Sequence, residues 1–221
     1  MITNLFSTFD PSTGLFSLNW LSSLILLLFM PMRFWYIPNR YIIFINKILN
    51  TISFELNLLI NLRSLGRSLL FCSLFIFILF NNFLGLFPYI FTRSRHLVFS
   101  LSLSLPLWLT FVLFGFLNNT NHMFCHLVPI GTPTILIPFI VCIETVRNLI
   151  RSGSLAVRLT ANIIAGHLLI TLLGERSINS EIYMNIIILI QILLILFESA
   201  VCVIQSYVFT VLRTLYYREV S

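Results

Sequence analysis

Charge is scarce in this sequence, and lysine is almost missing. Asp, Glu, Lys and Arg make up only 9% of the 221 residues, and Lys47 is the only lysine. A soluble domain of this size could not cover its surface with so few charges. The single lysine lies outside any G-x-x-x-x-G-K-[ST] motif, which excludes a P-loop nucleotide site. The basic residues stand singly, which excludes the clustered charge of a nucleic-acid-binding protein.

Cysteine is also sparse, and its four positions lie far apart in the chain. Three of them fall in apolar runs, where a free thiol behaves as a small hydrophobic side chain. The first apolar run has no basic segment before it and no A-x-A-like site after it. We therefore expect no cleavable signal peptide.

Apolar residues dominate what remains, at 58% of the chain, and several runs are long enough to cross a bilayer. The sequence therefore predicts an all-α integral membrane protein with a single membrane domain over 1–221. The expected elements are a first span over 15–32, an amphipathic helix over 41–66, spans over 68–91 and 97–117, and two long helices over 135–173 and 181–217.

The segment 41–66 differs from the spans because polar residues recur in it at steps of three and four. They are Asn46, Asn50, Ser53, Asn57, Asn61 and Ser64. This spacing is typical of an amphipathic helix. We expect the helix to lie on the membrane surface or against other helices. The alternative is a span with one polar seam.

The run 135–173 is too long for an upright span. Its 39 residues (173 − 135 + 1) would extend about 58 Å as one helix. The hydrocarbon core is only about 30 Å thick. With a short polar turn over 174–180, this run and 181–217 are expected to form an antiparallel hairpin tilted more than about 45° from the membrane normal.

The distribution of basic residues predicts the orientation of the chain. The segment 33–67 carries five of them and is expected to face the positive, inner side of the membrane. Counting spans from there places the C-terminal tail on that same side, and the N-terminus on the opposite side.

One arginine, Arg158, stands in the apolar run SLAVRLTANIIAGHL over 154–168. A charge at membrane depth costs at least about 2.5–3.5 kcal/mol, so its retention indicates a function. On a helical wheel one narrow sector holds Glu144, Asn148, Arg151, Arg158 and Asn162. His167 lies outside this sector and is expected to face another neighbour.

The last long helix carries a single polar stripe, with Gln191, Glu198 and Gln205 repeating every seven residues. Together the two helices place ionisable groups at graded depths. Glu144 and Glu219 are expected toward the inner face, Arg158 and Gln205 near the middle, and His167 and Glu198 toward the outer face. Such a series is typical of a proton relay, because unpaired carboxylates at depth need water, a proton or a partner. The alternative is a set of ion pairs that only holds helices together.

His122, Cys125 and His126 have a spacing that could bind zinc on a helix. Pro129, Gly131 and Pro133 follow closely, so we expect an interfacial loop there. The sequence predicts no metal site and no cofactor.

Four stretches resemble subunit a of the rotary ATP synthases, in its mitochondrial form. They are SLAVRLTANIIAGHLL over 154–169, Glu144 fourteen residues before Arg158, NNFLGLFPY over 81–89, and FESAVCVIQSYVF over 197–209. The resemblance covers essentially the whole chain. It implies a stator subunit of the mitochondrial inner membrane that works beside a ring of c subunits, the peripheral stalk and other membrane-sector subunits.

The resemblance also implies a role for each candidate residue. Arg158 would be the essential arginine that faces the ring carboxylates. His167 and Glu198 would line the half-channel from the intermembrane space, and the order His then Glu is that of the mitochondrial form. Glu144 and Glu219 would line the matrix half-channel, although the family accepts other residues at Glu219. Asn162 and Gln205 would be polar neighbours of the arginine.

Two other functions are weighed against this one. A secondary transporter could bind an anion at Arg158, but such proteins usually contain paired repeats, and no internal repeat is found. A purely structural subunit of a respiratory complex would leave the sector around Arg158 unexplained. Isolation of the protein with a ring of small carboxylate-bearing hairpins would favour the proton-conducting subunit.

Overall fold

The structure is a computed structural model, and it describes residue 10 and residues 18–22, 37–60, 65–87, 90–118, 120–128, 133–179 and 184–220. Every regular element among these residues is helical. Five of the described helices (α2, α3, α4, α6 and α7) are long and apolar enough to cross a membrane. The all-α class and the multi-pass character predicted from the apolar runs are therefore confirmed.

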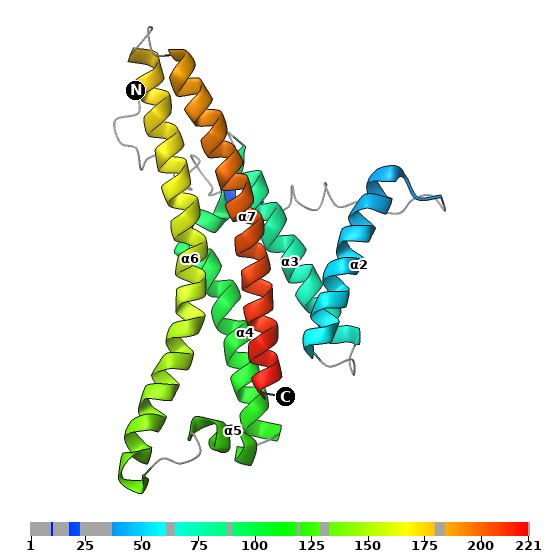
Figure 1. Cartoon of the computed structure of the whole chain (residues 1–221), viewed down its shortest axis with the longest axis vertical. Helices are drawn as coiled ribbons and strands as arrows, with labels where there is room; N and C mark the ends of the chain where they lie inside the picture. Colours follow the sequence, from blue (N-terminus) through cyan, green and yellow to red (C-terminus); the bar gives the residue numbers. More distant parts are fainter. Residues whose placement is uncertain are drawn as a thin grey trace.

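The helical elements follow one another in the chain order shown in Figure 1. They are η2 (Leu18–Leu21), α2 (Arg40–Ile60), α3 (Leu65–Leu86), η3 (Arg93–Arg95), α4 (Leu97–Asn118), α5 (Thr120–Leu127), η4 (Thr134–Leu136), α6 (Ile137–Asn179) and α7 (Met184–Val220). Apart from residues 18–22, the expected first span over 15–32 lies outside the described residues.

The helices α6 and α7 form the long axis of the molecule and run side by side in opposite directions (Figure 1). With 43 and 37 residues, they extend about 65 Å and 55 Å. Both are longer than the hydrocarbon core is thick, as the apolar runs predicted. Their tilt relative to a membrane stays a prediction.

Two predicted loops are helical instead. The expected polar turn over 174–180 was wrong, because α6 continues through Gly174 to Asn179. A single glycine costs a helix only about 1 kcal/mol, which its neighbours can outweigh. The expected loop around Cys125 was also wrong, because α5 covers Thr120–Leu127. Pro129 and Pro133 follow this helix and cannot break it.

The helix α2 leans away from the other helices and meets them at its C-terminal end (Figure 1). Leu56 and Ile60 are buried there against Phe71, Cys72 and Tyr217. Most of the preceding turns are exposed. The position of α2 on the membrane surface stays a prediction.

A second apolar cluster lies where α3, α6 and α7 meet. Its buried members are Ile78, Leu155, Leu159 and Phe209. Leu155 and Leu159 are three residues before and one residue after Arg158, so one face of α6 is fixed against the core at the level of the arginine. This packing positions the site described next.

Candidate functional site

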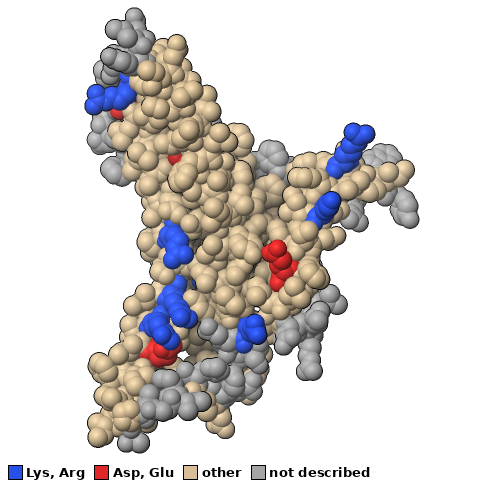
Figure 2. Space-filling model, viewed as in Figure 1, with Lys and Arg blue, Asp and Glu red and all other residues tan. Residues whose placement is uncertain are grey.

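Arg158 lies near the middle of α6 and points away from the core. Its side chain is exposed, whereas Ala156 and Leu159 beside it are 0% and 5% exposed. Among the described residues, none forms a hydrogen bond or an ion pair with Arg158. Figure 2 shows basic side chains at intervals down the side of the molecule that α6 forms, with acidic side chains near some of them. The charge of Arg158 is therefore available to a group outside the described residues.

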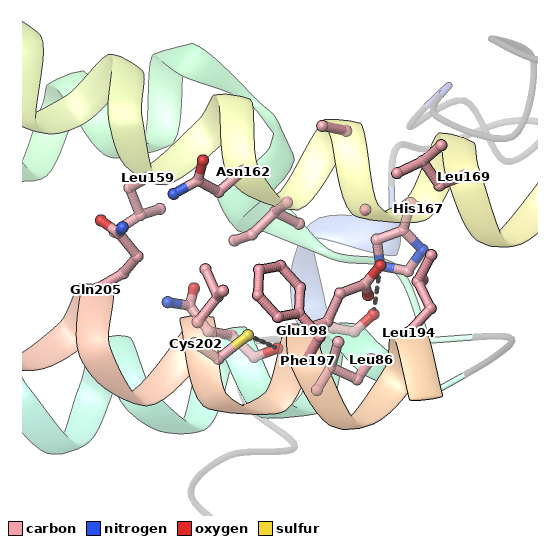
Figure 3. A pocket seen from close by; sticks show the side chains of 16 residues that line it. Leu86, Leu159, Asn162, His167, Leu169, Leu194, Phe197, Glu198, Cys202 and Gln205 are labelled. Carbon is pink, nitrogen blue, oxygen red and sulfur yellow. Dashed lines mark hydrogen bonds between the residues drawn. The ribbon is translucent and has the colours of Figure 1, made fainter. Parts of the chain in front are cut away.

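A pocket of about 320 Å³ lies between α3, α6 and α7 (Figure 3). The residues of α6 that line it all follow Arg158 in the sequence. We call it the Glu198 pocket. Its polar lining residues are Asn82, Asn162, His167, Glu198 and Gln205. The four residues predicted as neighbours of the arginine and of the outer half-channel thus line one pocket. Most of the remaining lining is aliphatic or aromatic, such as Phe197 and Leu194.

The imidazole of His167 is held by two neighbours from outside α6. Its Nε2 donates a hydrogen bond to the carbonyl oxygen of Gly85, at 2.6 Å. Gly85 is in the last turn of α3, where carbonyl groups lack a partner within the helix, so His167 supplies one. Nη2 of Arg95 lies 3.3 Å from both ring nitrogens. Because Nε2 carries the proton given to Gly85, Nδ1 is the acceptor for Arg95. His167 therefore faces α3 and η3, as expected from its place outside the wheel sector that holds Arg158.

Arg95 belongs to η3, outside the spans, and is itself half-buried. Removal from water lowers the pKa of its guanidinium to about 10, which still leaves the group charged at neutral pH. A permanent cation therefore lies beside His167.

The carboxyl group of Glu198 lies against the backbone of α6 at Gly166. A Cβ atom added to Gly166 would overlap Oε1 of Glu198, so the glycine creates the space that this carboxyl occupies. Oε1 is buried and has no hydrogen-bond partner among the described residues. One helical turn later in α7, Sγ of Cys202 approaches the Asn82 carbonyl oxygen at 3.8 Å. In Figure 3, Glu198 and His167 project from facing helices into the same end of the pocket.

A second pocket, of about 340 Å³, lies at the other end of α6, against α4, α5 and α7. We call it the Glu144 pocket. Its polar lining residues are Glu144, Arg147, Asn148, Arg151 and Tyr216. Glu144 forms an ion pair with Arg147 one turn later. The guanidinium of Arg151 lies over the ring of Tyr216, 5.8 Å from its centroid.

The residues that share one sector of the helical wheel do not share one site in the structure. Glu144, Asn148 and Arg151 line one pocket, Asn162 lines the other, and Arg158 lines neither. The reason is the length of α6, because its neighbours change from α4 and α5 to α3 along its course. The side chain of Glu219 and those of His122 and His126 lie outside what the structure describes.

Several contributors to the Glu198 pocket escaped the sequence reasoning. Gly166 leaves the space that the Glu198 carboxyl occupies, Gly85 offers its carbonyl oxygen to His167, and Arg95 lies beside the His167 ring. Asn82 also lines the pocket. A polar pair inside an apolar run was the available signal for Asn82.

Comparison with known proteins adds the family. The family model described as "ATP synthase A chain" matches residues 16–218. The chain belongs to this family. "ATP synthase subunit a" of Drosophila melanogaster is 57% identical over 224 residues, and that of Anopheles quadrimaculatus is 56% identical over 226. The protein of the same name from Aedes aegypti is also 56% identical, and all three matches cover both chains completely. The predicted membership of the ATP synthase A chain family is confirmed.

Proposed function

We propose that this chain conducts protons in the membrane sector of a rotary ATP synthase, through two half-channels separated by Arg158. Its membership of the ATP synthase A chain family supports the assignment to ATP synthesis and proton transport. The observation that carries the proposal is the placement of two pockets with ionisable side chains on one helix, with an exposed arginine between them in sequence.

The spacing along α6 supports a separation of the two pockets. Glu144 precedes Arg158 by fourteen residues, and His167 follows it by nine. In a continuous helix these steps correspond to about 21 Å and 14 Å along the axis. Protons that reach one pocket then cannot pass directly to the other through this chain, and a carrier on a partner must connect them.

The exposed charge of Arg158 supports a ring of c subunits as that partner. A guanidinium without a counter-charge is expensive at membrane depth. Arginine stays protonated, so it cannot relay a proton itself, but its fork of N–H groups can hold a carboxylate by two hydrogen bonds. Ring carboxylates that pass Arg158 would lose their proton on one side and regain it on the other.

Each pocket then has its own task. His167 and Glu198, with Asn162 and Gln205 nearby, deliver protons from the intermembrane space to the ring. Glu144 and, further along, Glu219 pass protons to the matrix. The chain is not an enzyme by itself, because it binds no nucleotide and the ATP chemistry belongs to partner subunits. The peripheral stalk, other membrane-sector subunits and lipid surround it.

The proposed location is the mitochondrial inner membrane. The named relatives come from insects, and the motif order matches the mitochondrial form. The basic segment 33–67 favours a matrix position for that part of the chain. We therefore propose that the N-terminus faces the intermembrane space and the C-terminus the matrix.

Isolation of the intact complex, followed by cross-linking, tests the proposal. A cysteine introduced in place of Arg158 should form disulfides with cysteines placed beside the ring carboxylates. Cysteines placed at Glu175, which is exposed near the end of α6 and lines neither pocket, serve as the control. A chain that purifies alone and transports a solute would refute the proposal.

A further inference from the structure

Asn82 is a buried amide that the surrounding side chains leave unsatisfied. The residue is 2% exposed, and neither Oδ1 nor Nδ2 hydrogen bonds to any described residue. Its neighbour Asn81 is different, because its Nδ2 donates to the carbonyl oxygen of Phe77 at 2.9 Å. A buried polar atom without a partner loses its hydrogen bonds to water on folding and regains none in return. An amide with two such atoms therefore points to a ligand.

A small cavity adjoins this amide. Its volume is about 10 Å³, and it is lined by residues of α3, η3, α4, α6 and α7. Ser94 lines it too, is 1% exposed, and has a hydroxyl oxygen with no hydrogen-bond partner among the described residues. Two groups from separate segments, both buried and both unsatisfied, thus border the same space.

The size and the chemistry of this space fit one molecule of water. A cavity of about 10–15 Å³ on this measure holds one water, provided that two to four polar groups can bind it. The Asn82 amide offers a donor and an acceptor, and the Ser94 hydroxyl can serve as either. Ser100 also lines the cavity and, although its hydroxyl donates to the Leu97 carbonyl oxygen, it can still accept a hydrogen bond.

We propose that one ordered water molecule occupies this cavity and bridges the Asn82 amide of α3 to the Ser94 hydroxyl of η3. Asn82 and Leu159 line both this cavity and the Glu198 pocket. The water therefore fixes the wall of that pocket from behind, at the level where α6 carries Arg158. It is a structural ligand, and its presence does not depend on the proposed direction of proton flow.

The direct test is a cryo-EM map of the intact ATP synthase complex at a resolution that resolves ordered water. We expect a density peak in the cavity within hydrogen-bond distance of the Asn82 amide and the Ser94 hydroxyl. A well-resolved cavity without such a peak would overturn the proposal.

A double-mutant cycle gives a second test in the same complex. We expect Asn82→Leu and Ser94→Ala each to lower the temperature at which the chain is released from the complex by about 2–4 °C. The double variant should lose little more than the larger single variant, because both changes remove the same bridge. The matched control is Ser104→Ala, since Ser104 is also buried, and its hydroxyl has no hydrogen-bond partner in the described part of the chain, but it does not line the cavity.

The control predicts additivity between Ser104→Ala and Asn82→Leu. A rise in release temperature with Asn82→Leu would contradict the proposal, because replacing an amide that truly lacks partners by an apolar side chain of similar size relieves a penalty. Full additivity between Asn82→Leu and Ser94→Ala would contradict it as well.

Discussion

The two pockets on α6 have nearly equal volumes but opposite electrostatic character. In the Glu144 pocket the carboxylate is paired with Arg147, and Arg151 lies on the same lining. In the Glu198 pocket the carboxyl group forms no ion pair with any described residue, and one of its oxygens is buried without a hydrogen-bond partner. A carboxyl of the second kind must be protonated, hydrated or matched by a cation from elsewhere.

This difference is consistent with the separate roles proposed for the two pockets, proton delivery to the ring and proton release from it. A carboxyl without a fixed counter-charge is suited to take up and give away a proton on each passage. A carboxylate balanced by a guanidinium is suited to remain charged and to attract protons that leave the ring. The predictions below test this contrast, starting with the group that separates the two pockets.

The largest effect is expected at Arg158, where Arg158→Lys should abolish or nearly abolish proton-driven ATP synthesis. A lysine ammonium can lose its proton when removed from water, and it lacks the planar fork that can hold a carboxylate by two hydrogen bonds. The measurement is the rate of synthesis in membranes that carry the assembled variant complex. Near-normal synthesis would show that the arginine does not separate the pockets.

Removal of the charge should add a second defect. In Arg158→Ala a ring carboxylate could pass this chain while still protonated, and protons would then cross without synthesis. Passive proton permeability should therefore rise above that of both the wild type and Arg158→Lys. Equal permeability in the two variants would mean that the fixed cation is not the barrier.

The next largest effect is expected from the two carboxyl groups, and it should differ by side. Loss of a group that transfers protons typically lowers a rate about 10²–10⁴-fold, and we expect a loss of this order for Glu198→Leu. Glu144→Leu should cost less, because Asn148 and exposed arginine remain to hold water in that pocket.

The pH of each side separates the two variants. Acidification of the intermembrane side should partly restore synthesis in Glu198→Leu, because its defect lies in uptake, but should not restore it in Glu144→Leu. Glu175→Leu is the control, since Glu175 is exposed and lines neither pocket. The same pH response in both variants, or unchanged coupled flux at both sites, would count against separate half-channels.

A smaller effect is expected at Gly166, and it tests whether the Glu198 carboxyl must lie against bare backbone. The added methyl group of Gly166→Ala would overlap this carboxyl and displace it. Displacement of a reacting group by about 1 Å can lower a rate about 10²-fold. We therefore expect synthesis to fall about 10- to 100-fold while the complex still assembles.

The matched control for this change is Gly153→Ala in the same helix. A Cβ atom at Gly153 would have no described neighbour within 4 Å, and alanine favours the helix by about 1 kcal/mol. Synthesis in this variant should be close to that of the wild type. An equal loss in both alanine variants would point to general damage to α6.

Some features of the two pockets could be predicted from the sequence. The heptad stripe of α7 was sufficient to predict that Glu198 and Gln205 share a face, because helical periodicity is a local property, and both line the Glu198 pocket. His167 was paired with Glu198 by its expected depth, whereas the wheel placed His167 outside the sector of Asn162. The two long helices were predicted from run length alone, and α6 and α7 are both longer than the hydrocarbon core is thick. Their tilt in the membrane stays a prediction.

What the sequence could not predict depends on contacts between distant segments. The bond from His167 to the Gly85 carbonyl joins the end of α3 to α6 across 82 residues, and no periodicity encodes it. The space at Gly166 exists only because α7 places Glu198 there. The wheel also joined Glu144 and Asn162, since a wheel does not record that the neighbours of a long helix change along its length.

The smallest effect is expected from Arg147→Gln, which makes the Glu144 pocket resemble the Glu198 pocket by removing the cation that pairs with Glu144. The Arg147 side chain is 56% exposed, and exposed ion pairs contribute only about 0–1 kcal/mol. By the relation of about 1.4 kcal/mol per tenfold change, the rate of synthesis should fall less than about fivefold. The measurement is the rate of synthesis at fixed driving force in membranes that carry the assembled variant complex. Arg176→Gln, which changes an exposed arginine that lines neither pocket, should leave this rate unchanged. A loss as large as that of Glu198→Leu would show that the ion pair is essential to the pocket and that the contrast drawn between the two carboxyl groups is wrong.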